Sequence, residues 1–441
     1  MDLPAHGLGA ADLRHLLDEL GAGDVDWRAG RGWSLVYDSP AWHQALVHEA
    51  AARYADENAL SSTAFPSAQH FESRVVRMVG SVVAPGVPSF GMFASGGTES
   101  TMVAVKAYRD LARQADPSLV VPVTAHPAFG KAAAYLGLRL VTVAVGPDGR
   151  PDPAAVLAAC DESTVAIGLS APNYPYGVVD PIPEIAVLAA ERGIGVHVDA
   201  ALGGLFLPFL TAAGVTPPRF ALDVPGVTSV AVDLHKYGYG AKGASVILFA
   251  SNELRHAAYH VALGWPGGAY ASSAVLGTRA VGPAAAAFTA MVTLGRSGYE
   301  ALVAQVMSTA RALQTGLADA QRGAFRVVGD PPMSVFAVTT DQVQVPLVAG
   351  GLQRRGWWID AQGPPPSIHF IVFPRHEQVL DHFLADVADA VADAAAEARD
   401  AAPGAPGPLA SYGVMVRGSG SLTEAALRAH LDARFDGREA P

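Results

Sequence analysis

Seven short apolar runs between residues 90 and 249 constrain the fold more than any other feature of the chain. Apolar residues flank these runs without alternating with polar ones, which predicts strands that are buried on both faces. Helical segments separate several of the runs, for example over residues 131–137 and 183–192. This alternation predicts an α/β fold built around a mostly parallel sheet. The runs are 90–94, 119–123, 138–145, 165–169, 194–198, 227–232 and 245–249.

The chain on either side of these runs predicts a division into three parts. Residues 1–60 are expected to form helices and loops, and residues 61–300 to form a large domain around the sheet. Beyond residue 300 the pattern changes to long helices with short strands near 334–339 and 368–373, which predicts a smaller α+β domain over residues 301–441. Residues 401–408 are rich in proline and glycine and predict a linker before a last helix.

The composition indicates a globular protein of enzyme size. Of the 441 residues 50% are hydrophobic, yet no apolar run reaches the length of about 18 residues that a membrane span requires. The sequence also opens without a signal-peptide pattern. A formal net charge of −11 without basic clusters argues against a nucleic-acid partner. The single cysteine, Cys160, excludes an internal disulfide and fits a reducing compartment, so we expect a cytoplasmic protein.

Lys236 is the residue that points most directly to chemistry. It follows the apolar run 227–232 and opens a stretch rich in glycine and tyrosine. A lysine is costly to bury, and an amine held away from water is partly deprotonated, as formation of a Schiff base with an aldehyde requires. Pyridoxal 5'-phosphate (PLP) is a cofactor that binds to lysine in this way. The alternative is a lysine at the edge of the core whose ammonium group reaches solvent.

A glycine turn between a predicted strand and helix offers a place for the phosphate of PLP. Gly97 allows close approach of the backbone, and Thr98 adds a hydroxyl or an N-cap at the helix start, where amide groups attract anions. His235, next to Lys236, is also available to the phosphate. A simple turn before a helix is the alternative interpretation.

Two further strand ends supply groups suited to the pyridine ring of PLP. Asp199 can pair with the protonated ring nitrogen, and Ala201 would form a small apolar floor under the ring. His126 could stack on the exposed ring face. The alternatives are a helix cap or salt bridge for Asp199 and an ordinary hydrogen-bonded position for His126.

These motifs follow one another at successive strand ends, where open α/β sheets bind ligands. In that order the chain resembles the fold-type I PLP enzymes of the group II decarboxylase family, and within it most closely the sphingosine-1-phosphate lyase branch. The resemblance extends over roughly residues 27–430. It rests on the segments 95–100 (Ser-Gly-Gly-Thr-Glu-Ser), 104–110, 171–177, 197–204, 232–243, 265–272 and 365–370.

The resemblance implies an aspartate aminotransferase-like large domain with PLP as cofactor, and no metal ligands. In it Lys236 is the Schiff-base lysine, Asp199 the pyridinium partner and His126 the stacking histidine, while Gly97, Thr98 and His235 hold the phosphate. Ser272 matches a residue that reaches the cofactor of a neighbouring subunit, which implies an obligate homodimer. Asn173 matches a polar residue near the 3'-oxygen of PLP. Tyr37 and Lys242 match residues that contact a substrate phosphate.

Two departures from the lyase pattern affect the expected substrate. Ser61 stands where the lyases usually have a histidine that helps to hold the substrate phosphate. Its absence removes one charge-assisted contact of about 1.5–3 kcal/mol, which leaves the head group of the substrate open. Ala201 stands where the lyases usually have a cysteine, and alanine is typical of the decarboxylases.

We expect retro-aldol cleavage of a β-hydroxy amine to an aldehyde and an amine, because the pocket selects which bond breaks. A polar group near Tyr37, Lys242 or Tyr239 is expected to deprotonate the β-hydroxyl. The alternative is an amino-acid decarboxylase that releases CO₂, with Arg279 as the candidate for binding a carboxylate. A catalytically idle scaffold is disfavoured because Lys236, Asp199 and His126 are all intact.

Overall fold

The computed structural model describes residues 3–400, 410–411, 414–415 and 423–436. The predicted linker at residues 401–408 therefore lies outside the described residues. Beyond it the structure places two short strands, β14 (Ala410–Ser411) and β15 (Val414–Met415), and a final helix, α12 (Glu424–Asp436).

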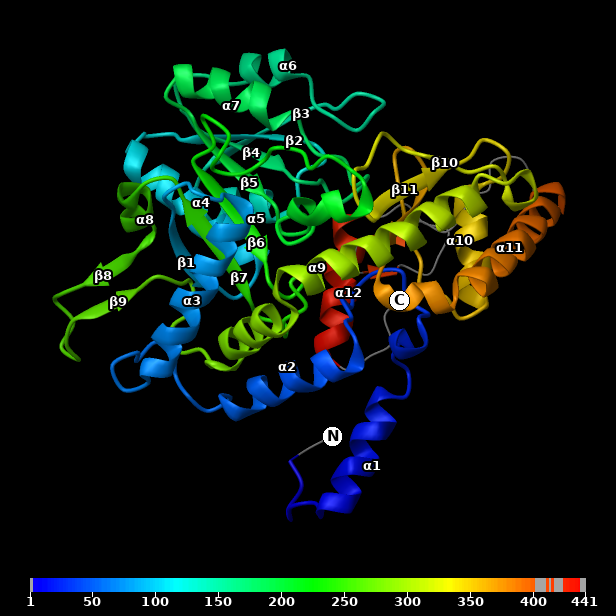
Figure 1. The fold of residues 1–441 in the computed structure, drawn as a ribbon, viewed down its shortest axis with the longest axis horizontal. Coiled ribbons are helices and arrows are strands. Elements are labelled where there is room, and N and C mark those ends of the chain that lie inside the picture. The colour runs from blue at the N-terminus through cyan, green and yellow to red at the C-terminus, as the bar shows by residue number, and fades with distance from the viewer. Residues whose placement is uncertain (1–2, 401–409, 412–413, 416–422, 437–441) are drawn as a thin grey trace.

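A seven-stranded sheet forms the centre of the molecule, with the strand order β1-β7-β6-β5-β4-β2-β3. All neighbours from β6 to β3 pair in parallel, and β7 is antiparallel to both β1 and β6. The expected α/β fold with a mostly parallel seven-stranded sheet is therefore confirmed (Figure 1). The strands are β1 (Phe90–Ala94), β2 (Ser118–Pro122), β3 (Arg139–Val143), β4 (Thr164–Ser170), β5 (Gly195–Asp199), β6 (Ser229–Asp233) and β7 (Ser245–Phe249).

The strands are buried on both faces of the sheet, which explains why their sequences are continuous apolar runs. In β7, Val246 and Leu248 join one hydrophobic cluster, whereas Ile247 and Phe249 on the opposite face join another. Strands β2, β4, β6 and β7 are buried along their whole length. β3 differs from the expectation because it is the edge strand, and most of its residues are exposed or only partly buried.

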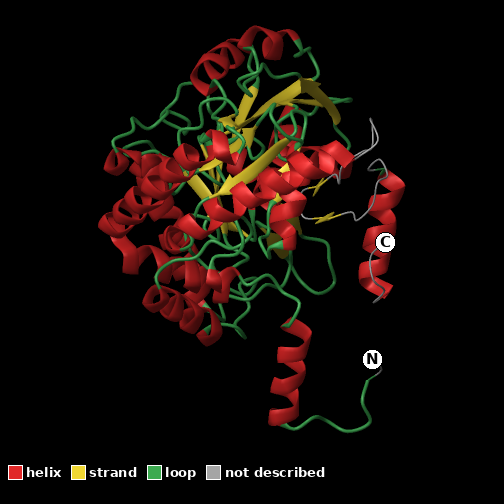
Figure 2. Ribbon diagram, turned by 90° about the vertical axis from the view of Figure 1, so that its right-hand side faces the viewer, coloured by secondary structure: helices red, strands yellow, loops and turns green. Residues whose placement is uncertain are grey.

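Helices pack against both faces of this sheet and connect its strands (Figures 1 and 2). α4 contacts strands β1 and β4 to β7, while α7 contacts β5 and α6 contacts β2. Helix α9 is interrupted at Gly295, where a φ of 59° suits glycine. The helices are α3 (Pro66–Val83), α4 (Gly97–Ala112), α5 (Ala128–Leu136), α6 (Pro153–Ala158), α7 (Ile182–Glu191), α8 (Asn252–Ala258) and α9 (Gly282–Leu317).

A second, antiparallel sheet follows α9 in the chain, with the order β10-β11-β13-β12. Two helices that pack on each other, α10 (Val345–Arg354) and α11 (Leu380–Asp400), accompany it. The predicted division at residue 300 falls inside α9 and stays a prediction. The strands of this small sheet are β10 (Arg326–Val327), β11 (Val335–Thr339), β12 (Asp360–Gln362) and β13 (Ser367–Ile371).

Two elements extend away from this body (Figure 1). Helix α1 (Ala10–Gly21) has no buried residue, whereas α2 (Ala41–Arg53) packs against α9. The hairpin of β8 (His260–Ala262) and β9 (Tyr270–Ser272) projects on the side of α8 and α3. Among the described helices, none combines the length and the apolar character needed to span a membrane.

Candidate functional site

A cavity of about 310 Å³ lies at the edge of the large sheet where β1, β5 and β6 end. The carboxyl ends of parallel strands meet at this edge, so residues far apart in sequence come together there. Seven of the predicted cofactor residues line the cavity. They are Gly97, Thr98, His126, Asp199, Ala201, His235 and Lys236.

Lys236 forms an ion pair inside this cavity. Its Nζ lies 3.2 Å from Oδ2 of Asp233, the last residue of β6, whose side chain is only 2% exposed. His235 contacts the same carboxylate oxygen, with Nε2 3.6 Å from Oδ2. Nδ1 of His235 accepts a hydrogen bond from the amide of Ala244 at 3.1 Å, so the neutral ring carries its proton on Nε2. Burial lowers the pKa of His235, and the neighbouring Asp233 partly opposes that shift.

Asp199 and His126 occupy two other walls. Oδ1 of Asp199 accepts a hydrogen bond from the amide of Ala201 at 3.0 Å, which orients the carboxylate at the end of β5. Nδ1 of His126 accepts from the amide of Ala128 at 3.1 Å and fixes the ring after β2. Burial lowers the pKa of His126, and the carboxylate of Asp199 partly opposes this shift. A neutral His126 can present an uncharged ring face to an aromatic cofactor.

The glycine turn brings the start of α4 to the opposite side of the cavity. A Cβ on Gly97 would lie 3.1 Å from Oδ2 of Asp233 and 3.4 Å from Cβ of Ala201. A Cβ on Gly96 would lie 3.3 Å from Cε1 of His235. Side chains at these positions would fill part of the space that the lining residues leave, so glycine keeps it open for a ligand.

The residues present fit PLP. The backbone of Gly96–Thr98 at a helix start suits its phosphate, and the carboxylate of Asp199 suits a protonated pyridine nitrogen. Lys236 provides the amine for its aldehyde, and His126 a ring to stack on its face. Oδ1 of Asp233 is buried without a hydrogen-bond partner among the described residues, which is unusual for a carboxylate and fits a site built for a further polar group.

Tyr37 and Lys242 lie together, although neither lines this cavity. Nζ of Lys242 lies 5.4 Å from the centre of the Tyr37 ring and donates to the carbonyl of Leu35 at 3.0 Å. Loss of hydration, together with the charge of Lys236, lowers the pKa of Lys242. Tyr239 is buried nearby in the left-handed region, with a φ of 57°. Burial raises its pKa well above the ordinary value.

The other predicted site residues lie outside this cavity. The Asn173 amide donates to the carbonyl of Gly149 and accepts from the amide of Tyr176, so local loop contacts occupy it. Ser272 ends the projecting strand β9, and its hydroxyl donates to the carbonyl of Ala274. Ser61 is exposed ahead of α3. Arg279 forms an ion pair with Glu72 at 3.0 Å.

The structure adds Glu99, which the sequence analysis did not assign. It lies in the first turn of α4 and is only 7% exposed. Oε2 accepts from the amide of Ser95 at 2.6 Å, and Oε1 accepts from the amides of Val275 and Leu276 at 2.6 and 3.2 Å. One carboxylate thus ties the glycine turn to the segment that follows Ser272. A glutamate directly after the Gly-Gly-Thr turn, at a buried helix start, was the available signal.

Comparisons with known proteins identify a family and relatives that are similar to this chain. A family model described as the pyridoxal-dependent decarboxylase conserved domain matches residues 35–338. The sphingosine-1-phosphate lyase of Dictyostelium discoideum is 38% identical over 393 residues, which cover 88% of this chain and 74% of that protein. Sphingosine-1-phosphate lyase 1 of Rattus norvegicus is 36% identical over 395 residues, covering 88% of this chain and 69% of that protein.

A sphingosine-1-phosphate lyase is also among the solved structures that resemble this chain. The sphingosine-1-phosphate lyase of Burkholderia pseudomallei K96243 superposes with a TM-score of 0.84 at 33% identity, covering 91% of this chain and 94% of that chain. The glutamate decarboxylase of Lactobacillus brevis CGMCC 1306 superposes with a TM-score of 0.76 at 17% identity, covering 89% and 95% of the two chains, and so shares the fold.

Proposed function

Because the chain belongs to the pyridoxal-dependent decarboxylase family, we propose that it is a PLP-dependent lyase that cleaves a β-hydroxy amine into an aldehyde and an amine. One observation carries the proposal: Lys236, Asp199 and His126 line one cavity in a chain whose relatives at 36–38% identity are sphingosine-1-phosphate lyases. PLP, when bound, supplies the aldehyde for the substrate amine and an electron sink.

The cleaved bond joins Cα, which carries the amine, to Cβ, which carries the hydroxyl. Loss of the hydroxyl proton lets this bond break, so that Cβ becomes an aldehyde and the electron pair remains on Cα. A proton delivered to Cα then completes the amine. We assign this delivery to Nζ of Lys236, whose ion pair with Asp233 holds a proton at the cavity wall. Asp199 would keep the pyridine nitrogen protonated.

Lys242 is the stronger of the candidates for removing the β-hydroxyl proton. Its pKa is lowered, which brings the amine closer to the range where a general base works at neutral pH. The raised pKa of Tyr239 makes its phenolate a minor species. Binding of a phosphate or another anionic head group, the role that the resemblance gives Tyr37 and Lys242, needs the charged ammonium instead, so Lys242 takes only one of these two roles.

Decarboxylation of an amino acid is the second candidate, supported by family membership and by Ala201 at the cavity floor. It needs a cation for the substrate carboxylate. Arg279, the residue expected to supply it, is paired with Glu72 at 3.0 Å and is not among the residues that line the cavity. This arrangement favours carbon–carbon cleavage.

We also propose that the enzyme works as a homodimer. The segment 261–276 around β8 and β9 carries apolar side chains that are about half or more exposed, at Val261, Leu263, Trp265, Val275 and Leu276. Helix α1 adds Leu13, Leu17 and Leu20. Apolar side chains gathered on projecting elements support burial against a second copy of the chain, where Ser272 would reach the partner's cofactor. The single buried cysteine supports a cytoplasmic location.

Product analysis tests the reaction. The PLP-loaded enzyme is incubated with phosphorylated and free long-chain β-hydroxy amines, β-hydroxy amino acids and common amino acids, and the products are identified by mass spectrometry. An aldehyde with phosphoethanolamine is the expected pair if the head group is phosphorylated. An aldehyde with an unphosphorylated amine would support cleavage of the Cα–Cβ bond and show that the head group of the substrate is not phosphorylated. Release of CO₂ without an aldehyde would replace the proposal with the decarboxylase.

A further inference from the structure

The stretch of residues 259–280, which we call the hairpin segment, has no buried residue, although Ala258 and Val281 on either side of it are buried. It contains the hairpin of β8 and β9, which projects from the body beyond α8 (Figure 1). Two paired strands of three residues each are marginally stable by themselves. The position of the hairpin therefore depends on contacts that hold the two ends of the segment.

Lys106, on α4, holds the start of the hairpin segment. Its Nζ donates to the carbonyl of Ala257 at 2.8 Å, in the last turn of α8, and to the carbonyl of Tyr259 at 3.1 Å, directly before β8. The third proton of the ammonium group is donated to Oδ2 of Asp110 at 2.9 Å. A cation at the C-terminal end of a helix is favourable because the last carbonyls and the helix dipole attract it. Lys106 thus fixes the point at which the chain leaves α8.

Asp110 keeps this ammonium group in place. Its Oδ1 accepts a hydrogen bond from Nε of Arg109 at 2.7 Å, so that the carboxylate is paired with two cations. Burial acts to raise the pKa of Asp110, but the hydrogen bonds from Lys106 and Arg109 lower this pKa below its ordinary value. Asp110 is therefore charged at neutral pH and orients Lys106 toward the end of α8.

Glu99 holds the other end of the hairpin segment. It lies seven residues before Lys106 on α4, so the two side chains leave the same face of the helix two turns apart. Oε1 of Glu99 accepts from the amides of Val275 and Leu276 at 2.6 and 3.2 Å. One helix thus holds both ends of the segment with two oppositely charged side chains.

The part of the segment between these two points carries exposed apolar side chains. Val261, Leu263 and Trp265 are 59, 79 and 60% exposed. Residues 259–278 contain no aspartate, glutamate, lysine or arginine. A surface of this kind is suited to another apolar protein surface rather than to a charged partner, and interfaces of permanent homodimers are the more apolar ones. A second copy of the chain is therefore the partner that this surface fits.

We propose that Lys106 positions the hairpin segment for its contact with a second copy of the chain. This inference rests on the proposed homodimer, in which Ser272 at the end of β9 reaches the partner's cofactor. Lys106 fixes the start of the segment, Glu99 fixes its end, and the apolar side chains between them face the partner. A two-fold interface uses the same patch of both subunits, so a displaced hairpin weakens the interface in both. Lys106 is a positioning residue, since it acts through the hairpin.

Sedimentation equilibrium of the PLP-loaded full chain tests the proposal by measuring the dissociation constant of the dimer. Lys106→Met keeps an unbranched side chain but removes all three donors, so the dissociation constant should rise about tenfold or more. The control is Lys131→Met, at an exposed lysine on α5 whose Nζ lies 5.5 Å from the centre of the Tyr135 ring. This control should leave the dissociation constant at the wild-type value.

Hydrogen exchange of backbone amides locates the effect in the chain. At protein concentrations well above each dissociation constant, amides of residues 259–276 should exchange about tenfold faster in Lys106→Met than in the wild type, whereas amides of β5 and β6 should exchange at wild-type rates. Faster exchange in these strands as well would indicate general loss of structure and overturn the positioning role.

The oligomeric state of the wild type separates this inference from the proposed homodimer. A wild type that stays monomeric at every concentration would overturn the homodimer itself. A dimeric wild type with the same dissociation constant as Lys106→Met would retain the homodimer and overturn the role of Lys106. Faster exchange of the hairpin with an unchanged dissociation constant would likewise overturn it, because the hairpin would then move without affecting the contact between subunits.

Discussion

The ammonium nitrogen of Lys236 lies 3.2 Å from Oδ2 of Asp233, a carboxylate with an exposed fraction of 2%. The two residues are three positions apart, so the end of β6 itself sets their spacing. Burial of a carboxylate is costly unless cations or hydrogen-bond donors lie beside it, and the nitrogens of Lys236 and His235 lie 3.2 and 3.6 Å from Oδ2 of Asp233. We therefore propose that Asp233 positions the amine of Lys236 for the proposed reaction.

Removal of the negative charge of Asp233 tests whether this residue positions the amine of Lys236. Asp233→Asn keeps the shape but removes a charge-assisted contact of about 1.5–3 kcal/mol, so kcat/KM should fall about 10- to 100-fold. Affinity for PLP should not weaken, because the lost carboxylate has the same sign of charge as the cofactor phosphate. Steady-state kinetics and a PLP titration measure the two effects. Asp223→Asn, which breaks a surface pair with Arg219, is the control. A parallel loss of activity and of cofactor affinity would indicate structural damage instead.

Removal of the reactive amine should separate cofactor binding from catalysis. In Lys236→Ala, Asp199, His126 and the glycine turn still hold PLP through non-covalent contacts, while the amine that moves the proton is gone. We expect retained PLP after gel filtration, measured by absorbance and mass spectrometry, with aldehyde formation below detection. Wild-type activity in this variant would exclude Lys236 from the chemistry.

Glu99 should strengthen the binding of PLP, because its carboxylate holds two loops together. Its two oxygens accept from three amides, and Glu99→Gln offers only one acceptor oxygen for them. Affinity for PLP should fall about tenfold or more, since each lost charge-assisted bond is worth about 1.5–3 kcal/mol. Fluorescence titration with PLP measures the change. The control is Glu184→Gln, an exposed glutamate in the first turn of α7. Equal affinities of the two variants would contradict the role.

Ser61 provides a test of the head group. If the substrate is phosphorylated, Ser61→His should strengthen its binding by about 1.5–3 kcal/mol and lower KM about tenfold, because an imidazolium adds a charge-assisted contact. The same variant should leave KM for the unphosphorylated amine unchanged. Competition between the two amines in one assay measures the ratio directly. A fall in KM for both would show that the added ring acts through apolar contact rather than charge.

Much of this arrangement follows from local sequence. Seven apolar runs predict the sheet because each strand is buried on both faces, and Asp199, His126 and Lys236 share a cavity because they follow strands that end at one edge. β3 was not recognised as an edge strand, because the run 138–145 that contains it is mostly apolar despite Arg139 and Thr142.

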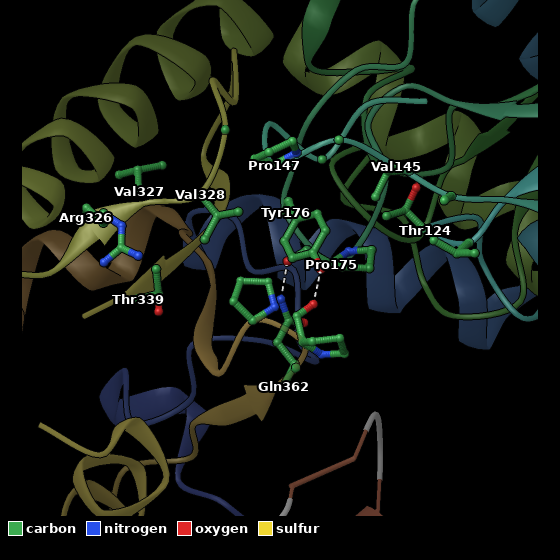
Figure 3. A pocket seen from close by; sticks show the side chains of 18 residues that line it. Thr124, Val145, Pro147, Pro175, Tyr176, Arg326, Val327, Val328, Thr339 and Gln362 are labelled. Carbon is green, nitrogen blue, oxygen red and sulfur yellow. Dashed lines mark hydrogen bonds between the residues drawn. The ribbon is translucent and has the colours of Figure 1, made fainter. Parts of the chain in front are cut away.

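The features that the sequence did not reveal depend on contacts between residues that are far apart along the chain. Glu99 meets Val275 and Leu276 from 176 and 177 residues away, and no local pattern encodes that meeting. Asn173 is the opposite case, since the sequence predicted it at the cofactor. Its side-chain amide instead forms hydrogen bonds with Gly149 and Tyr176. The groove of about 1000 Å³ that Tyr176 and Pro364 line (Figure 3) likewise forms where the turn between β12 and β13 lies beside Tyr176.

Buried histidines should make the fold sensitive to acid. Burial lowers the pKa of His197 to about 3 and the pKa values of His369 and His376 to about 4. In the unfolded chain these groups take up protons near pH 6.5, so the unfolded state binds more protons between about pH 4 and 6.5. Their contribution to stability is therefore complete above pH 6.5 and is lost as the pH falls. Burial raises the pKa of Asp180 to about 7, and this group acts in the opposite sense.

Three histidines against one aspartate leave a net of two groups, each worth about 1.4 kcal/mol per pH unit. These four groups should therefore contribute a fall in the free energy of unfolding of up to about 3 kcal/mol per unit from pH 6.5 to 4, as measured by urea denaturation at several pH values. His376 is the residue to vary, because its Nδ1 accepts from the amide of Phe373 and its Nε2 donates to the carbonyl of Gly32, which requires a neutral ring. His376→Gln should be less stable at pH 7 and should lose about 1.4 kcal/mol per pH unit of the slope. The exposed His6→Gln should keep the wild-type slope, and equal slopes in all three proteins would show that His376 takes up its proton without unfolding.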